Sequence, residues 1–167
     1  MTDSARLWVQ SVRSTLDDLR RPDAVTLISG ERSSASELLR ALGDALSISP
    51  ASVTEVALTP APAASERELL QRLSGRTVLF DLETICWVPW LQLDPLRLLR
   101  QQARRHGVVA VWPGQINGSV LSFSAPGRRD YVSVDAPGIT VMRPTTTRFP
   151  DEVPFTIERA AGERALH

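Results

Sequence analysis

The fold of this 167-residue chain is decided by one stretch near its beginning, Ala24-Val25-Thr26-Leu27-Ile28-Ser29-Gly30, which runs on into Glu31-Arg32-Ser33-Ser34-Ala35-Ser36-Glu37-Leu38-Leu39. The first part is short, apolar and partly β-branched, and it stops at a glycine, which is typical of a buried strand. The second part has Ser34 and Glu37 at the spacing of a capping box, ahead of a leucine stripe, and predicts a helix capped by Ser34. A buried strand that leads into a helix indicates a βαβ unit.

The same alternation continues along the chain. Three further apolar runs predict strands, at residues 52–58, 77–80 and 108–112. Between them, Ser65 and Glu68 form a second capping box, and Asp94-Pro95 supplies the cap and first residue of a helix that continues to residue 106. Strands separated by helices pair in parallel, and helices cover both faces of the sheet. We therefore expect an α/β fold with a mostly parallel sheet.

The pattern changes after Pro113-Gly114. Short runs predict an added C-terminal β-hairpin region, at residues 120–124, 131–134 and 139–142. The last part of the chain is polar and interrupted by prolines, with one short strand expected near 153–157. The length suits one domain, so we expect a single α/β domain at 1–145 and a tail at 146–167 that is partly extended or disordered.

Composition excludes several kinds of chemistry. The 19 basic and 19 acidic residues balance, so no overall field steers the chain towards nucleic acid or a membrane. All the basic residues are arginines, so no lysine can clamp a phosphate or form a Schiff base. Cys86 is the only cysteine, which excludes a disulfide within the chain. No signal peptide or membrane-spanning run is evident, and we expect a soluble cytoplasmic protein.

The turn at Gly30 has the context of a phosphate-binding P-loop, because it joins a strand to a leucine-rich helix. Counted from Gly30, the Gly-Lys-Ser/Thr positions hold Ala35, Ser36 and Glu37, and with one residue deleted they hold Ser34, Ala35 and Ser36. Neither alignment has the lysine, and Glu37 in the first helical turn would repel a phosphate. We therefore predict a vestigial nucleotide-binding loop, formed by Gly30, Ser33, Ser34, Ala35 and Ser36. The favoured interpretation is a capped helix that binds no nucleotide and no cofactor.

Two carboxylates follow the strand at 77–80 and leave an ATPase open as the alternative. Asp81 stands where a P-loop enzyme has its magnesium-binding aspartate, and Glu83 lies two residues further on. With ATP and Mg²⁺ bound, Ser36 and Asp81 would hold the metal, while Asp81 and Glu83 would be the catalytic residues. Asp81 is equally typical of a residue that caps the next loop.

Two surfaces are candidates for contacts with a partner. Arg97, Arg100 and Arg104 form a basic stripe on the 95–106 helix, which could touch an acidic protein or nucleic-acid phosphates, or simply be a solvated face. Trp87 and Trp90 could form a docking surface or cover the edge of the sheet. The two histidines are isolated, so neither a metal site nor a nucleophilic triad is evident.

Residues 24–143 resemble BrxF, the small P-loop component of type 3 BREX phage-defence systems. The resemblance is carried by Val78-Leu79-Phe80-Asp81, Leu93-Asp94-Pro95-Leu96-Arg97-Leu98-Leu99, Val109-Ala110-Val111-Trp112 with Gly114, Leu121-Ser122-Phe123-Ser124-Ala125-Pro126-Gly127 and Asp130-Tyr131. It implies a P-loop-NTPase-like fold and a role beside larger methyltransferase, phosphatase-like and ATPase proteins that block phage replication. Gly30 and Asp81 match the family's nucleotide-binding positions, whereas the lysine position does not.

These observations lead to one expected function and two alternatives. We expect an accessory or assembly protein of a BREX-like antiviral defence complex, which contacts other proteins of that complex and has no ATPase activity of its own. The first alternative is a partner-activated ATPase of the same system. The second is a nucleic-acid-binding adaptor that uses the 95–106 helix.

Overall fold

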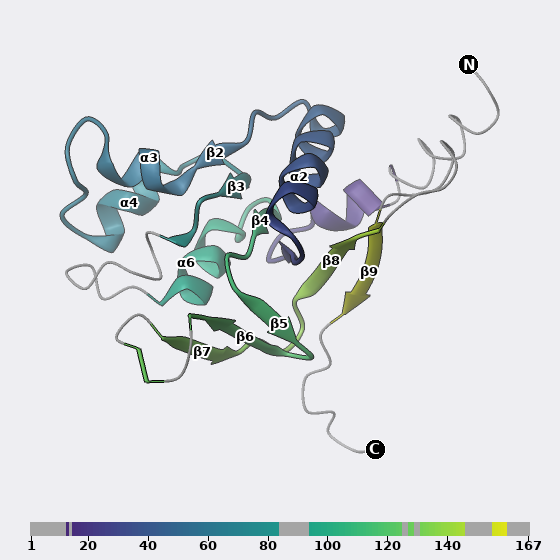
Figure 1. Cartoon of the computed structure of the whole chain (residues 1–167). Coiled ribbons are helices and arrows are strands. Elements are labelled where there is room, and N and C mark those ends of the chain that lie inside the picture. Colours follow the sequence, from purple (N-terminus) through teal and green to yellow (C-terminus); the bar gives the residue numbers. More distant parts are fainter. Residues whose placement is uncertain are drawn as a thin grey trace.

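The computed structural model describes residue 13 and residues 15–83, 94–124, 127–128, 131–145 and 155–159 (Figure 1). A short helical stretch at 15–19 precedes the first strand. The elements that follow are, in chain order, β1 (Val25–Ile28), α2 (Arg32–Leu46), β2 (Ala51–Ser52), α3 (Val53–Leu58), α4 (Glu66–Arg72), β3 (Val78–Phe80), α6 (Pro95–Gln102), β4 (Val108–Val111), β5 (Gln115–Asn117), β6 (Val120–Phe123), β7 (Val132–Asp135), β8 (Thr140–Pro144) and β9 (Phe155–Arg159).

The main sheet has six strands in the order β2-β3-β4-β1-β8-β9. Every pair from β2 to β8 is parallel, and only β9 runs antiparallel to its neighbour. Strand β1 is central, with Leu27 opposite Ala110 on one side and Val141 on the other. The predicted α/β fold with a mostly parallel sheet is confirmed.

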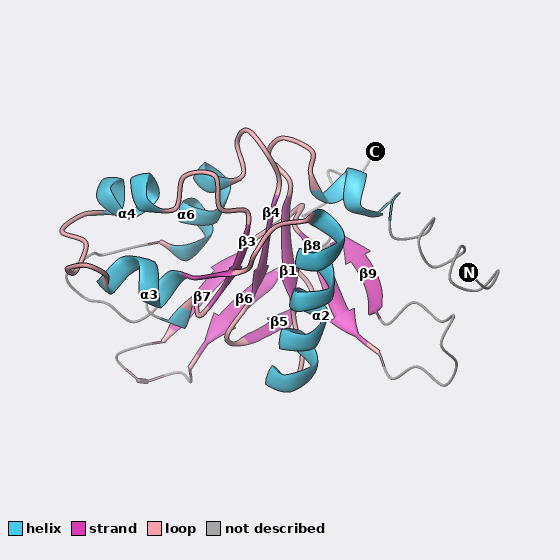
Figure 2. Cartoon of the chain, turned by 90° about the horizontal axis from the view of Figure 1, so that it is seen from above, coloured by secondary structure: helices cyan, strands magenta, loops and turns pink. Residues whose placement is uncertain are grey.

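Alternate residues of each strand face opposite sides of this sheet, and each side has its own core. Leu27 packs with buried residues of α3, α4 and α6, while Ile28 packs with α2 and the helical stretch at 15–19. Figure 2 shows α2 separated from α3, α4 and α6 by the strands. Helices therefore cover both faces, as parallel sheets require.

A second sheet is antiparallel, in the order β5-β6-β7, and begins just beyond the carboxyl end of β4. Buried Trp112 connects the two sheets, because its indole Nε1 donates to the carbonyl oxygen of Ser122 at 3.0 Å. A Cβ on Gly114 would stand 1.8 Å from the same carbonyl oxygen, so only glycine fits there. The predicted pairing of 120–124 with 131–134 is confirmed as β6 and β7.

The strand predicted at 52–58 is wrong. Only Ala51 and Ser52 pair with β3, and Val53 begins the helix α3. The Oγ atom of Ser52 accepts a hydrogen bond from the backbone N–H of Glu55 at 3.2 Å, which caps the helix. The Ser-x-x-Glu spacing signals this cap, but the β-branched residues that follow it favour a strand by propensity, and the cap prevails.

The predicted start of α2 is also wrong. The helix begins at Arg32 with Glu31 at the N-cap position, so Ser34 lies inside the first turn and Glu37 beyond it. The side chain of Glu31 makes no capping hydrogen bond. The backbone N–H of Ala35 donates to the carbonyl oxygen of Glu31 at 2.8 Å, which closes the first helical turn ahead of the predicted cap.

Other boundaries agree with the sequence in part. Ser65 caps α4 by accepting from the N–H of Glu68, and Asp94 caps α6 ahead of Pro95, both as predicted. Helix α6 ends at Gln102 rather than at residue 106, and turns follow it. Strand β5 was not predicted, although Asn117-Gly118 is a strong hairpin signal. The short strand expected near 153–157 corresponds to β9.

Helices α3 and α4 are joined through one arginine. The Nη2 atom of Arg72 donates to Glu68 at 2.8 Å. Its Nη1 atom lies within hydrogen-bond distance of four carbonyl oxygens, two in the last turn of α3 and two in the segment that follows, those of Val56, Ala57, Thr59 and Ala61. The pKa of Glu68 is lowered, first because the N–H of Ala64 donates to its carboxylate and then because Arg72 lies beside it.

We expect Arg72→Met to lower the free energy of unfolding by about 2 kcal/mol, because the carbonyl oxygens lose a charged donor. Arg67→Met is the matched control, because Arg67 lies on the exposed face of the same helix, and its effect should stay below about 0.5 kcal/mol. Urea denaturation followed by circular dichroism measures both. Equal losses would show that the Arg72 hydrogen bonds do not hold the two helices together.

Candidate functional site

The residues singled out by the strand ends lie at one edge of the main sheet. Gly30, Asp81 and Trp112 follow β1, β3 and β4, which are parallel and therefore end on the same side. Strand β4 lies between the other two, so the ends of β1 and β3 are separated by two strand spacings, about 10 Å. This carboxyl edge is where ligands bind in open α/β sheets.

The glycine at this edge is required by packing within the chain. Gly30 has φ +152°, a conformation that other residues rarely adopt. A Cβ at this position would stand 3.2 Å from Cδ of Pro144, at the end of β8. The preceding N–H, of Ser29, donates to the carbonyl oxygen of Met142 at 2.9 Å. Gly30 therefore fits β8 closely against the end of β1, whether or not a phosphate ever binds there.

The connection between β1 and α2 is much shorter than a P-loop. In the motif G-x-x-x-x-G-K-[ST], a long glycine-rich loop separates the first glycine from the helix. Here Glu31 alone lies between Gly30 and the first helical residue, Arg32. The loop whose N–H groups would surround a phosphate is therefore missing.

The serines and alanine of the predicted loop lie within α2 itself. Ser33 and Ser36 are exposed, Ser34 is partly buried and Ala35 is fully buried in the core. Since the N–H of Ala35 already donates to Glu31, it is not available to a phosphate. The structure thus brings these residues together as a helix rather than as a cradle.

The carboxylate nearest the start of α2 belongs to Glu31. The expectation that Glu37 occupies the first turn is wrong, because the helix begins two residues ahead of Ser34 and has no acidic residue in its first turn. Glu31 stands at the N-cap and is exposed. A negative charge at this end still opposes an incoming phosphate, but it comes from a different residue.

Asp81 is engaged in a structural contact with α3. Its backbone has φ +56°, and its Oδ2 atom accepts a hydrogen bond from Oγ of Ser52 at 2.8 Å. Its backbone carbonyl oxygen accepts from Oγ1 of Thr54 at 3.0 Å. Because Ser52 is also the cap of α3, Asp81 fixes the start of that helix. Glu83, two residues on, is partly buried.

Sequence reasoning missed the cation at this edge. Arg143 of β8 donates from Nη1 to Oγ of Ser29 at 3.4 Å and from Nη2 to the carbonyl oxygen of Ile116 at 2.9 Å. Its Nε atom donates to Glu158 at 2.8 Å. It therefore connects the end of β1 to β5 and β9, and its charge is already paired. An arginine at the end of an apolar run gives no sequence signal for such a position.

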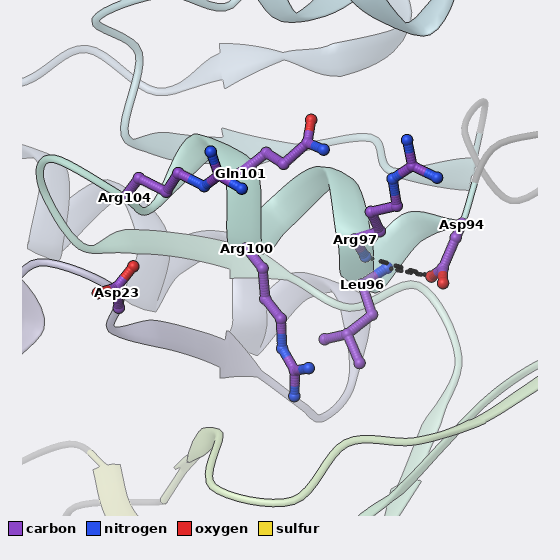
Figure 3. A pocket seen from close by; sticks show the side chains of 7 residues that line it. All are labelled: Asp23, Asp94, Leu96, Arg97, Arg100, Gln101 and Arg104. Carbon is purple, nitrogen blue, oxygen red and sulfur yellow. Dashed lines mark hydrogen bonds between the residues drawn. The ribbon is translucent and has the colours of Figure 1, made fainter.

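The arginine stripe lies on another part of the surface. Arg97 and Arg100 project from α6, and Arg104 from the turn that follows it. The three line a cavity of about 540 Å³ together with Asp23, Asp94, Leu96 and Gln101 (Figure 3). Asp94 accepts from the N–H groups of Leu96 and Arg97, so the cap that starts α6 also positions the first arginine.

Some of the predicted residues lie outside the described residues, namely Trp87 and Trp90, together with Cys86. Among the residues that the structure does describe, no three His, Cys, Asp or Glu side chains gather as metal ligands would. No helix within the same ranges is both long enough and apolar enough to cross a membrane.

No protein-family model matches this chain, and no curated protein or solved structure matches it either. The resemblance to BrxF therefore stays a prediction. The contacts of the described residues are the basis for the proposals below.

The structural role of Asp81 can be tested directly. We expect Asp81→Ala and Ser52→Ala each to lower the free energy of unfolding by about 1–2 kcal/mol, because each removes the hydrogen bond that holds the start of α3. The double variant should lose less than the sum of the two, since both changes break one interaction. Denaturation curves for the four proteins give the coupling. Strict additivity would mean that Asp81 is not held by Ser52.

Proposed function

We propose that this chain is a P-loop-like module that neither binds nor hydrolyses nucleotide and acts by contacts with other proteins of a phage-defence complex of the BREX kind. The absence of nucleotide binding is inferred from the connection between β1 and α2, in which Glu31 alone separates Gly30 from the helix. The chain also has no lysine. A triphosphate would thus meet neither the loop nor the charge that bind it in P-loop proteins.

The arrangement of the sheet supports the P-loop-like part by fold-level analogy. A P-loop ATPase needs the strand before its phosphate loop and the strand before its magnesium-binding aspartate to end at the same edge. Strands β1 and β3 do so, with β4 between them. By that analogy Gly30 and Asp81 take the corresponding positions, but both are engaged in contacts within this chain.

The state of the edge also disfavours the ATPase alternative. Oδ2 of Asp81 is bonded to Ser52, and one arginine at this edge, Arg143, is paired with Glu158. Magnesium binding through Oδ2 would have to compete with that charge-assisted hydrogen bond, which is worth about 1.5–3 kcal/mol. The chain has no lysine to hold the phosphates that would arrive with the metal. Protein contacts are therefore the better-supported activity, and the resemblance to BrxF supplies the kind of complex.

Isothermal titration calorimetry with ATP and MgCl₂ tests whether the chain binds nucleotide. We expect no binding tighter than about 1 mM, because the connection provides no cradle of free N–H groups. Asp81→Asn is titrated in parallel as the matched control. Micromolar binding by the native chain that Asp81→Asn abolishes would contradict the proposal and support the ATPase alternative.

To test whether the chain belongs to a defence complex, the products of the neighbouring genes are needed. We expect the genes beside this one to encode a methyltransferase and a large ATPase, and the chain to co-purify with at least one of their products. ATP turnover of that assembly should be the same with the native chain and with Asp81→Asn. A loss of turnover with Asp81→Asn would make the chain a partner-activated ATPase, and unrelated neighbouring genes would remove the defence role.

A further inference from the structure

The cavity beside α6 is lined mostly by charged side chains. Three arginines line it, and Figure 3 shows their guanidinium groups spread apart, with Arg97 and Arg100 extending in opposite directions in this view. A second cavity of about 630 Å³ shares Gln101 and Arg104 with the first and adds Arg105 and His106. Because they share two lining residues, the two cavities are neighbours along α6 and the turn after it. We call this pair of cavities the α6 groove.

The arginines of the α6 groove are hardly used by the rest of the chain. Arg97 lies 3.6 Å from Glu66, with 64% of its side chain exposed, and Arg100 reaches the carbonyl oxygen of Pro137 at 3.5 Å. The guanidinium of Arg104 makes no hydrogen bond or ion pair within the described ranges, although its backbone N–H donates to the carbonyl oxygen of Gln101. By comparison, the guanidinium of Arg72 has five hydrogen-bond acceptors within the chain. The charges along the groove are therefore free to meet a ligand.

We propose that the α6 groove binds an acidic segment of a partner protein. The inference rests on the proposed function, since it gives the surface by which a protein-contact module would engage its complex. Charge complementarity identifies the occupant as anionic, because arginine forks bind carboxylates in paired hydrogen bonds.

The acidic residues around the groove distinguish a protein segment from nucleic acid. Asp23 and Asp94 line the same cavity as the arginines, and Glu66 stands beside Arg97. A uniformly negative phosphate backbone would be repelled by these carboxylates. A protein segment can place carboxylates opposite the arginines and a basic or amide group opposite Asp23. Among the described residues, neither cavity is lined by Phe, Tyr or Trp, and His106 supplies the one aromatic ring, so bases would find little stacking surface.

The spacing of the arginines suits an extended acidic segment. A helical rise of 1.5 Å per residue separates Arg97 from Arg104 by about 10 Å along α6 and its following turn. In an extended chain, side chains on one face recur about every 7 Å. Two carboxylates on alternate residues can thus reach two of the three arginines at once.

Fluorescence anisotropy with a short labelled peptide of alternating glutamate and glutamine, whose amides can face Asp23, tests the proposal at low salt. We expect the native chain to bind it, and the triple variant R97Q/R100Q/R104Q to bind it about tenfold more weakly, because three charge pairs are lost. Binding should weaken as salt rises, since the groove is open to solvent. Thermal unfolding of each protein shows that the substitutions leave the fold intact.

R32Q/R40Q/R67Q is the matched control, because it removes three exposed arginines that line neither cavity and changes the net charge equally. It should alter the peptide affinity by less than about twofold. Equal weakening by both triple variants, or no binding of the peptide to the native chain, would overturn the proposal. A short DNA duplex is measured alongside. If the duplex binds more tightly than the peptide and only R97Q/R100Q/R104Q loses it, the groove is a nucleic-acid site instead.

Failure here can be told apart from failure of the proposed function. Suppose that the chain binds no Mg-ATP and co-purifies with its neighbours, but does not bind the acidic peptide. That result supports the proposed function and contradicts only the proposal for the α6 groove. Conversely, peptide binding that depends on Arg97, Arg100 and Arg104 stands whether or not nucleotide is bound elsewhere.

Discussion

The structure depends on the burial of β1 from every side. Its four residues pair with β4 along one edge, three of them pair with β8 along the other, and helices cover both faces. Strand β4 ends level with β1, at Val111 opposite Ile28, whereas β8 continues to Pro144. Gly30 provides the end of β1 by turning the chain against Pro144, and α2 follows almost at once. The same tight turn that completes the core thus excludes a wide anion-binding loop.

Much of the fold could be predicted because its signals are local. The buried runs that became β1, β3 and β4 are apolar on both faces, and Asp94-Pro95 starts α6 as its residue types require. The Ser-x-x-Glu pattern shows where local signals fail. It occurs at Ser34, Ser52 and Ser65, and the last two are caps, whereas at Ser34 the helix has already begun. The packing of the turn at Gly30 determines where α2 begins, and the spacing of residues within α2 does not show it.

The sequence predicts where the residues of the candidate site lie, but it does not predict which hydrogen bonds they make. Parallel strands must deliver Gly30 and Asp81 to one edge, and the sequence supports that much. It does not show that Ser52 would bond to Asp81, because their pairing depends on β2 lying beside β3. Nor does it show that Arg143 would lie beside Ser29, since β8 joins β1 from more than a hundred residues away in the chain. Contacts between distant segments determine which of the polar groups remain available.

The one-residue link between Gly30 and α2 also makes the departure from nucleotide chemistry hard to reverse. Replacing a serine of α2 by lysine would place an ammonium group on a helix whose first turn is already closed through Ala35 and Glu31. A working loop would need several inserted residues, and they would displace Ala35 and Leu39 from the core or part Gly30 from Pro144. Each intermediate would be less stable than the present chain before it gained any affinity. Selection can therefore alter the outer surface of this protein freely while the turn stays as it is.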